Sequence, residues 1–320
     1  MFSRRGVVIH PFELSQAWLD TARQLDLNVL ALHPPGGPRA AEHLQAMLDQ
    51  LRESETQALL AQARRQGMQV EYEMHALSYL MPRTLFASHP EWFRMDAQGE
   101  RVADFNLCAS SQEALGYLAD QAEALARLLP AESHRYYFWL DDVTAARCHC
   151  PQCRELSASE QQLLCVNAML AGIRRADPQG MLAYIAYLDA MEPPRRVKPA
   201  SGVFLEYAPI KRRLDRPLAD SDCAENAREF APLPELLACF GATHAQALDY
   251  WLDNSLLSGW QYPPKPFRLN GEVVRADTEA YHALGIDSVT CFACYLGPDY
   301  VALHGTPDLR AYGNALHGSA

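Results

Sequence analysis

The sequence predicts a single (β/α)8 barrel that spans residues 1–320. Eight short apolar stretches, rich in β-branched and aromatic residues, recur along the chain as expected of strands buried on both faces. Stretches with helical periodicity separate most of them. A doubly wound open sheet is the weaker alternative, because the chain contains neither the G-x-G-x-x-G spacing of a dinucleotide-binding turn nor a P-loop.

Each expected strand ends in or beside a polar residue. The eight strands are expected over residues 6–11, 28–34, 69–76, 136–142, 182–189, 203–209, 247–253 and 288–297. Their lengths suit strands better than helices, and Gly, Pro, Asn or Asp residues flank several of them.

Helices are expected between these strands, over residues 13–25, 39–66, 110–129, 157–175, 233–240, 276–284 and 308–316. Within the second of these, Ser54 and Gln57 have capping-box spacing, which predicts that a separate helix starts there. Ser157 and Glu160 have the same spacing at the start of the fourth. The proline-rich stretch 190–201 predicts a loop with at most a short helix.

Composition excludes several classes of protein. With 49% hydrophobic and 21% charged residues the chain can bury a large core, and disorder is not expected. The net charge of −11 argues against a nucleic-acid partner. The sequence contains no apolar core of a signal peptide and no run of about 20 apolar residues, so we expect a cytoplasmic protein without a membrane partner. Nothing in the pattern predicts an oligomeric state.

The strand ends carry the functional signal. In a (β/α)8 barrel the carboxyl ends of the strands and the loops after them form the active-site face. A single Asp at such an end commonly caps the next helix, but many ionisable side chains together predict a face that meets water or a ligand. The residues at these ends are His10, His33, Glu73, His75, Asp141, Asp142, Asp189, Glu206, Tyr207, Asp253, Asn254 and Tyr295.

Aromatic residues beside these ends suggest a carbohydrate pocket, because sugar rings stack on aromatic faces while polar groups bind the hydroxyls. For most of these aromatic residues, packing between barrel and helices is the simpler interpretation. The predicted substrate-binding residues are His10, His33, Glu73, His75, Tyr207, Trp251, Asn254 and Arg212.

Glycosidic hydrolysis requires a proton donor and a second carboxylate. The apolar run YYFWL (136–140) ends on Asp141 and Asp142, and two adjacent carboxyl groups favour retention of a proton on one of them. We expect Asp142, or else Asp141, to be the acid. Glu206 and Asp253 are the candidates for the opposing carboxylate.

The segments 89–115, 136–153, 156–175 and 203–212 resemble a bacterial family known as domain of unknown function 4838, and the similarity runs from about residue 5 to the C-terminus. The resemblance implies a glycoside-hydrolase-like barrel similar to α-glucuronidases and β-N-acetylhexosaminidases, with a carbohydrate substrate. Related hexosaminidases carry an Asp-Glu pair where this chain has Asp141-Asp142. A glucuronidase would also need a cation for the uronate, for which Arg83, Arg212 and Arg213 are available.

Three cysteines in a C-x-C-x-x-C motif, Cys148, Cys150 and Cys153, follow the fourth expected strand. Three thiolates this close can bind zinc with a fourth ligand, for which Cys108 is preferred and His149 and Cys165 are alternatives. Such a structural zinc would clamp the loop after Asp142. Free thiols and a disulfide or redox pair are the other interpretations, and no organic cofactor is expected. We expect Cys291 and Cys294 to pack in the barrel.

Two other functions are compatible with the sequence. His10, His33 and His75 end the first three expected strands and, with Asp142 or Asp253, can bind the metal of a metal-dependent hydrolase. Alternatively, the chain is a sugar-binding barrel without catalytic activity, which would keep the aromatic residues and tolerate loss of the acid.

Overall fold

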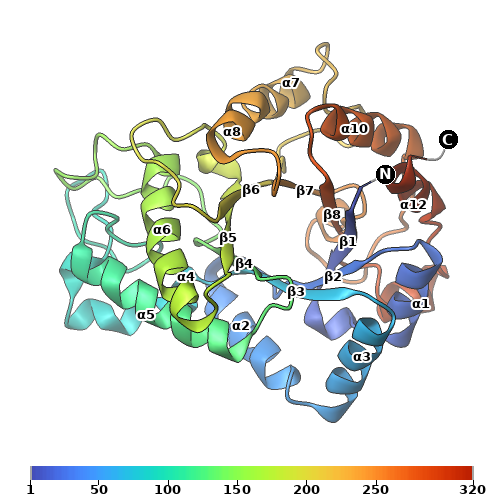
Figure 1. Cartoon of the computed structure of the whole chain (residues 1–320), viewed down its shortest axis with the longest axis horizontal. Coiled ribbons are helices and arrows are strands. Elements are labelled where there is room, and N and C mark those ends of the chain that lie inside the picture. Colours follow the sequence, from blue (N-terminus) through green and yellow to red (C-terminus); the bar gives the residue numbers. More distant parts are fainter. Residues whose placement is uncertain (1, 319–320) are drawn as a thin grey trace. The chain divides into compact units, whose positions relative to one another are not determined.

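The computed structural model describes residues 2–318 and contains eight strands that close into a barrel in the order β1 to β8 (Figure 1). All described strand pairs are parallel, as in the pairing of Gly6 with Val29 between β1 and β2. The predicted (β/α)8 barrel is therefore confirmed. The strands are β1 (Arg4–Ile9), β2 (Val29–Leu32), β3 (Gln69–His75), β4 (Arg135–Trp139), β5 (Met181–Ala186), β6 (Val203–Tyr207), β7 (Gln246–Asp249) and β8 (Ser288–Phe292).

An α-helix or a 3-10 helix follows every strand. The α-helices are α1 (Gln16–Gln24), α2 (Ala40–Gln50), α3 (Ser54–Arg65), α4 (Leu77–Leu80), α5 (Gln112–Leu128), α6 (Ala158–Ala176), α7 (Ala224–Phe230), α8 (Leu233–Phe240), α9 (Asn254–Leu257), α10 (Gly271–Ala283), α11 (Pro298–His304) and α12 (Arg310–His317). Short 3-10 helices are η1 (Pro11–Glu13), η2 (Gly37–Arg39), η3 (Arg83–Ala87), η4 (Pro90–Trp92) and η5 (Leu188–Ala190). Within residues 2–318, no helix has both the length and the apolar character needed to cross a membrane.

The capping signals were right at one helix and wrong at another. At α6 the Ser157 Oγ accepts from the backbone N–H of Glu160 at 3.1 Å. In turn the Ser157 N–H donates to the Glu160 carboxylate at 2.9 Å. The break between α2 and α3 also lies where expected. However, Glu53 is the N-cap of α3 and Ser54 is already helical, because the extended backbone of the cap falls one residue earlier.

The proline-rich stretch between β5 and β6 is a loop with only the short helix η5, as predicted. Helices α4, α7, α9 and α11 were not predicted. Helix α7 has little apolar periodicity, α4 is a single turn, and α9 is a single turn that depends on its cap rather than on a buried stripe.

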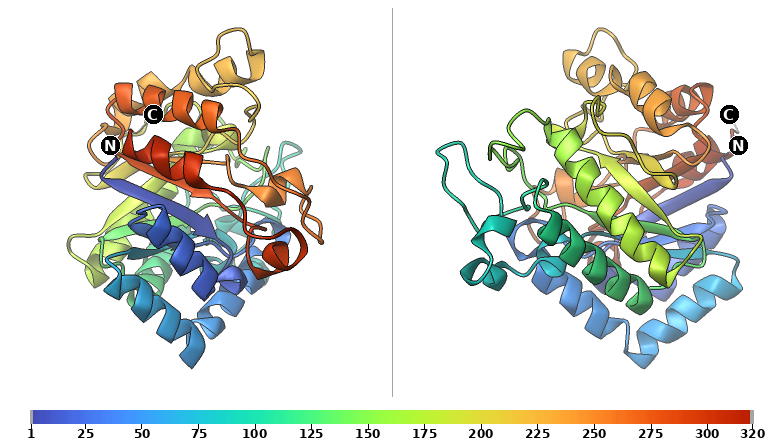
Figure 2. Two further views of the ribbon diagram at one scale, coloured as in Figure 1. Left: turned by 90° about the vertical axis from the view of Figure 1, so that its right-hand side faces the viewer. Right: turned by 60° about the vertical axis from the view of Figure 1, so that its left-hand side comes forward.

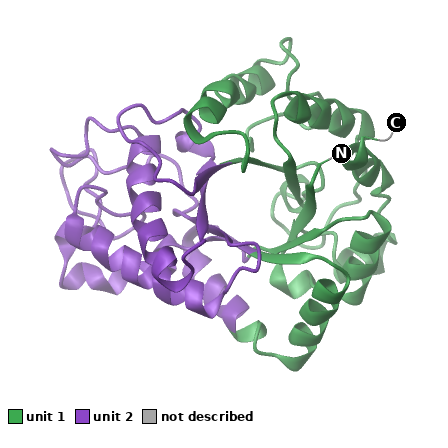
Figure 3. Ribbon diagram, in the orientation of Figure 1, with its two compact units in different colours: residues 1–33, 49–71, 206–320 green, residues 34–48, 72–205 purple. Residues whose placement is uncertain are grey.

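The chain divides into two compact units, which are described separately (Figure 3). Unit 1 comprises residues 1–33, 49–71 and 206–320 and contains β1, β2, β7 and β8. Unit 2 comprises residues 34–48 and 72–205 and contains β4, β5 and the carboxyl end of β3.

In unit 1, α12 packs on β1. The Tyr312 hydroxyl donates to the Gly6 carbonyl at 2.5 Å, and the Phe2 N–H donates to the Leu316 carbonyl at 3.1 Å. Figure 2 shows α12 and α1 beside β1. These bonds tie the C-terminal helix to the first strand.

In unit 2, α5 and α6 lie side by side and approach very closely (Figure 2). A Cβ atom built on Gly172 of α6 would lie 1.9 Å from the Ala119 carbonyl oxygen of α5. Only glycine permits this helix contact, since backbone atoms cannot yield as a flexible side chain can.

We therefore predict that Gly172→Ala lowers the free energy of unfolding by about 2–3 kcal/mol, because the added methyl group forces α5 and α6 apart. Urea denaturation measures this. Gly116→Ala on α5 is the matched control: no atom lies within 4 Å of the place that its methyl group would take, and an alanine in a helix interior should be neutral or stabilising by up to about 1 kcal/mol. Equal effects of the two substitutions would contradict the close packing.

Candidate active site

Asp141, just after β4, is held on both carboxylate oxygens. Oδ2 forms an ion pair with Arg83 and accepts from the Asn106 N–H at 2.7 Å, and Oδ1 accepts from the Ser78 N–H at 3.0 Å. Only 4% of the side chain is exposed. Asp141 therefore fixes the loop after β3 and the segment before α5 to the end of β4.

Asn106 completes this anchor. Its Oδ1 accepts from the Asp141 N–H at 3.2 Å, and its Nδ2 donates to the Ala146 carbonyl at 3.1 Å. The Arg83 guanidinium also donates to the Asn106 carbonyl at 2.8 Å. Asn106 has a φ of 52°, a left-handed conformation that asparagine tolerates better than most residues.

The neighbouring Asp142 has a different environment, with 31% of its side chain exposed. Its Oδ1 accepts from the Tyr187 hydroxyl at 3.0 Å and lies 4.0 Å from His75 Nε2. Within residues 2–318 its Oδ2 accepts no hydrogen bond. One oxygen is thus oriented, while the other has no hydrogen-bond donor among the described residues.

His75, the last residue of β3, is oriented by the backbone of the next strand end. Its Nδ1 lies 2.7 Å from the Leu140 carbonyl, which can only accept, so Nδ1 carries a proton. In neutral His75 the unprotonated Nε2 therefore faces Asp142. Trp139 packs edge-on against the imidazole, with ring centroids 5.1 Å apart.

Gly36, in the loop after β2, passes directly over this pair. A Cβ on Gly36 would lie 2.8 Å from Asp142 Oδ2 and 3.0 Å from His75 Cδ2. A side chain at position 36 would therefore collide with the Oδ2 of Asp142.

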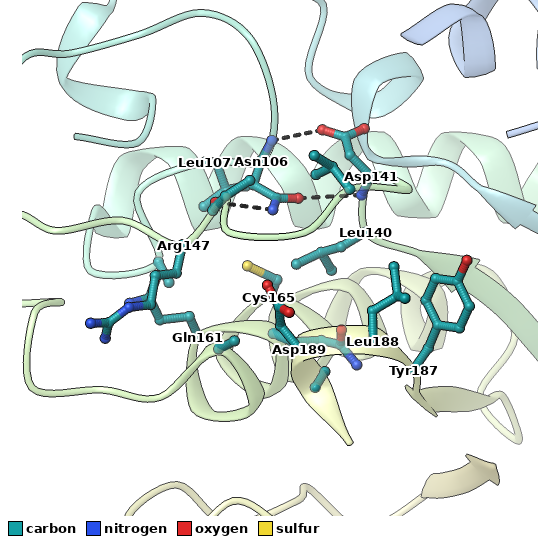
Figure 4. A pocket seen from close by; sticks show the side chains of 16 residues that line it. Asn106, Leu107, Leu140, Asp141, Arg147, Gln161, Cys165, Tyr187, Leu188 and Asp189 are labelled. Atoms are coloured by element: carbon teal, nitrogen blue, oxygen red, sulfur yellow. Dashed lines mark hydrogen bonds between the residues drawn. The ribbon is translucent and has the colours of Figure 1, made fainter. Parts of the chain in front are cut away.

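A pocket with a cavity volume of about 60 Å³ lies beside the Asp141 anchor (Figure 4). It is bounded by the segment at Asn106, the start of α6 at Gln161 and the loop after β5 at Asp189. Tyr187 and Asp141 both line it. Since the Tyr187 hydroxyl also reaches Asp142, the pocket adjoins the two aspartates and offers polar groups at its rim.

The C-x-C-x-x-C motif lies in the loop between β4 and α6, which also contains Asp141 and Asp142. The sulfurs of Cys148, Cys150 and Cys153 gather with that of Cys108, all within 4.8 Å of one another. The alternative fourth ligands His149 and Cys165 are not members of this group. No disulfide joins any described cysteine.

Unit 1 contains most of the other predicted residues, beginning with His10 and His33. The ring centroids of these histidines are 6.0 Å apart, and His10 Nδ1 donates to the His33 carbonyl at 2.8 Å. His10 also meets Glu13 and Cys294, with one potential ligand atom from each within 4.8 Å. Burial raises the pKa of Glu13 to about 7, although the N–H groups of His10 and Gly297 lower it.

Asp253 is buried at the start of α9. Its Oδ1 accepts from the Ser255 N–H at 3.0 Å, the Ser255 hydroxyl at 2.5 Å and the Leu256 N–H at 3.3 Å. Burial raises the pKa of Asp253 to about 6 against the effect of these bonds. Asn254 donates to the Lys265 carbonyl at 2.9 Å, and its buried Oδ1 has no partner among the described residues.

Besides His75, three predicted residues lie within strands rather than beyond them. Glu206 of β6 is fully buried and accepts from Gln246 at 3.1 Å. Its neighbour Tyr207 donates to the Glu229 carbonyl at 2.8 Å. Glu73 of β3, also fully buried, pairs in register with Tyr137 of β4.

Arg212 and Trp251 belong to a buried polar network in unit 1. The Arg212 guanidinium contacts Asp249 at 2.9 Å and Asp277 at 2.6 Å, and the Arg212 and Asp249 side chains, like that of Asp277, are fully buried. Trp251 Nε1 donates to Asp277 at 2.8 Å. Substrate binding by Arg212 or Trp251 would require this network to open. Arg213 is exposed and paired with Asp215.

A family model described as a domain of unknown function, DUF4838, matches residues 41–232, which is more than half of the chain. The chain belongs to the DUF4838 family. This match covers the Asp141 anchor, Asp142 and all four clustered cysteines, and it is shorter than the similarity expected from sequence. No curated protein matches the chain.

Solved structures resemble this DUF4838 chain over almost its full length. A β-galactosidase from the psychrophilic Marinomonas ef1 is 13% identical, with a TM-score of 0.53 over 98% of this chain and 58% of that one. An O-GlcNAc hydrolase of Thermobaculum terrenum is 10% identical, with a TM-score of 0.54 over 99% and 60%. The cold-adapted β-galactosidase of Rahnella sp. R3 is 12% identical, with a TM-score of 0.54 over 99% and 55%. This chain thus spans little more than half the length of each, and the likeness shows a shared fold.

Several residues that contact the predicted residues were not singled out from sequence. Gly36, Asn106 and Glu13 act through close approach or backbone contacts, which leave no motif. Asn106 precedes Cys108 by two residues, and this proximity to a predicted ligand is the one signal that points to it.

The two aspartates should differ in their effect on stability. We predict that Asp141→Ala lowers the free energy of unfolding by about 2–3 kcal/mol, because it leaves buried backbone donors and a partly exposed Arg83 without their partner. Asp142→Asn should change it by less than about 1 kcal/mol, since the amide oxygen still accepts from Tyr187. Urea denaturation of both variants measures this, and similar losses would refute the anchor.

Asp253 should give stability a specific pH dependence. Its folded pKa of about 6 lies above the ordinary 3.8, so the folded state binds more protons between these values and stability falls as the pH rises from about 4 to about 6. The loss reaches about 3 kcal/mol. Asp253→Asn stays neutral, so its stability relative to the native chain should rise by up to that amount across this window. Denaturant titrations at each pH test this, and a difference that is constant with pH would contradict it.

Proposed function

We propose that the chain is a glycosidase in which Asp142 donates the proton to the leaving group. The observation that carries this proposal is the contrast between the two aspartates: each oxygen of Asp141 is occupied, whereas Asp142 keeps an open Oδ2. A carboxyl group can act as general acid only if one oxygen holds a transferable proton within reach of the substrate.

The neighbours of Asp142 suit that role. After the proton leaves, negative charge develops on the carboxylate, and the Tyr187 hydroxyl that donates to Oδ1 at 3.0 Å stabilises it. His75 Nε2 lies 4.0 Å from the same oxygen, where an imidazolium would also offset the charge of the carboxylate. The pocket beside Asp141 and Tyr187 offers polar groups to a bound sugar.

A carbohydrate substrate is supported by the β-galactosidases and the O-GlcNAc hydrolase that share the fold. The second carboxylate, which acts as base or nucleophile, stays a prediction from the sequence, with Glu206 and Asp253 as its candidates. With a pKa of about 6, Asp253 is ionised at neutral pH, as this role requires.

A screen of aryl glycosides, including uronides and N-acetylhexosaminides, identifies the substrate, and the leaving group then tests Asp142. We predict that Asp142→Asn lowers kcat/KM about 10²- to 10⁴-fold on phenyl or alkyl glycosides, whose poor leaving groups need protonation. The loss should be much smaller on dinitrophenyl glycosides, whose leaving group departs unprotonated. Equal losses on both would contradict the assignment of the acid.

Two further variants sharpen this test. Gly36→Ala places a methyl group against Asp142 Oδ2. Like Asp142→Asn, it should lower kcat/KM, and the protein should stay folded. Asp120→Asn, at an exposed carboxylate on α5, should leave activity unchanged. Sugar binding without turnover of any glycoside would instead favour the non-catalytic sugar-binding barrel.

A metal-dependent hydrolase is the second candidate. The observation that favours it is the group formed by His10, Glu13 and Cys294, which differs from the histidine set expected from sequence. Activity that a chelator abolishes, and that His10→Ala removes while Asp142→Asn does not, would support it over the glycosidase.

A further inference from the structure

We propose that Cys108, Cys148, Cys150 and Cys153 hold a structural zinc ion that clamps the loops around Asp141. The four side chains come from two segments far apart in sequence, the end of the stretch before α5 and the loop after β4. All four are buried, and their sulfurs lie within 4.8 Å of one another. Buried thiols gathered from separate segments in this number are typical of a metal site.

The spacing of the sulfurs fits zinc quantitatively. A tetrahedral site with Zn–S bonds of about 2.3 Å places its sulfurs about 3.8 Å apart. Cys108 Sγ lies 3.7 Å from Cys150 Sγ and 4.0 Å from Cys153 Sγ. A disulfide needs about 2.05 Å and would pair the sulfurs two by two, and an iron–sulfur cluster would hold them further apart around its inorganic sulfides.

Polar groups point at the sulfurs as they would at thiolates. The Met95 N–H donates to Cys148 Sγ at 3.3 Å, and the Ser110 hydroxyl lies 3.3 Å from Cys108 Sγ and 3.5 Å from Cys150 Sγ. The Arg101 guanidinium approaches Cys148 Sγ at 3.9 Å. Four thiolates around one Zn²⁺ carry a net charge of two minus, which these donors and this cation offset.

The loop that carries the motif is preorganised by α6. Gln161 accepts from the Cys148 N–H at 2.8 Å and donates to the carbonyls of Cys148 at 2.9 Å and Cys153 at 3.0 Å. The motif therefore has a defined backbone, and ion binding adds the connection to Cys108.

The clamp acts on the anchor of Asp141. Asn106 precedes Cys108 by two residues and Ala146 precedes Cys148 by two, and Asn106 bonds both Asp141 and the Ala146 carbonyl. The stretch between β3 and α5 has only short helices, η3, η4 and the single turn α4, so side-chain contacts such as the Asp141 anchor order it. A metal that joins its end to the β4 loop adds a second constraint.

Metal analysis of the full chain, purified without chelator, tests the site directly. We expect about one zinc per chain, bound in a form whose cobalt derivative shows the intense visible and thiolate charge-transfer absorption of a tetrahedral sulfur site. Cys108→Ser and Cys153→Ser should each lower the zinc content at least about tenfold. Cys165→Ser, at a buried thiol on α6 outside the group, should retain it.

If the cysteine variants fail to fold, measurements on the native protein still test the zinc site. Titration with a mercurial thiol reagent should release the zinc as the four clustered thiols react, and the melting temperature of the stripped protein should fall by at least about 5 °C. Zinc that stays with both serine variants, iron in place of zinc, or a metal-free protein with unchanged melting temperature would overturn the proposal. The link from clamp to turnover rests on the proposed function, whereas the metal, thiol and melting measurements are independent of catalysis.

Discussion

The Asp141 carboxylate is the interaction on which the rest of the candidate site depends. It gathers Arg83, the Asn106 N–H and the Ser78 N–H, which belong to three separate parts of the stretch after β3, onto the end of β4. A buried carboxylate is costly unless its oxygens are fully paired, and here each oxygen has a donor. This pairing fixes the backbone at Asp142, so the position of the proposed acid follows from its neighbour.

Two adjacent residues of the same type thereby take different roles. Both carboxylate oxygens of Asp141 are occupied by hydrogen-bond donors. The side chain of Asp142 is partly exposed, accepts a hydrogen bond from Tyr187 and lies near the imidazole of His75, whose Nδ1 carries a proton. The division is produced by the surroundings and not by the residues. The four clustered cysteines are linked to the Asp141 anchor through the chain. Cys108 follows Asn106 by two residues, Cys148 follows Ala146 by two, and Asn106 donates to the Ala146 carbonyl.

The fold was predictable from sequence because eight buried strands leave eight apolar stretches, and the parallel barrel then determines at which end their polar residues lie. The same reasoning predicted that Asp141 and Asp142 follow β4, and the cysteine spacing suggested Cys108 as a partner of the C-x-C-x-x-C motif; the roles of these residues stay predictions. It could not find Gly36 or Asn106, whose roles depend on contacts between segments distant in sequence. Arg212 and Trp251 show the opposite case: both have side chains suited to sugar binding, but long-range pairing with Asp249 and Asp277 buries them. The wrong cap at Ser54 reflects a shift of one residue that sequence spacing does not resolve.

The most direct measurement is a crystal structure of the Asp142→Asn variant with an intact glycoside bound. We expect the substituted side chain to lie within about 2.6–3.2 Å of the glycosidic oxygen, while Asp141 keeps its contacts with Arg83 and Asn106. A glycoside bound with its scissile oxygen against an Asp141 released from its anchor, or bound far from both aspartates, would contradict the assignment of Asp142 as the acid.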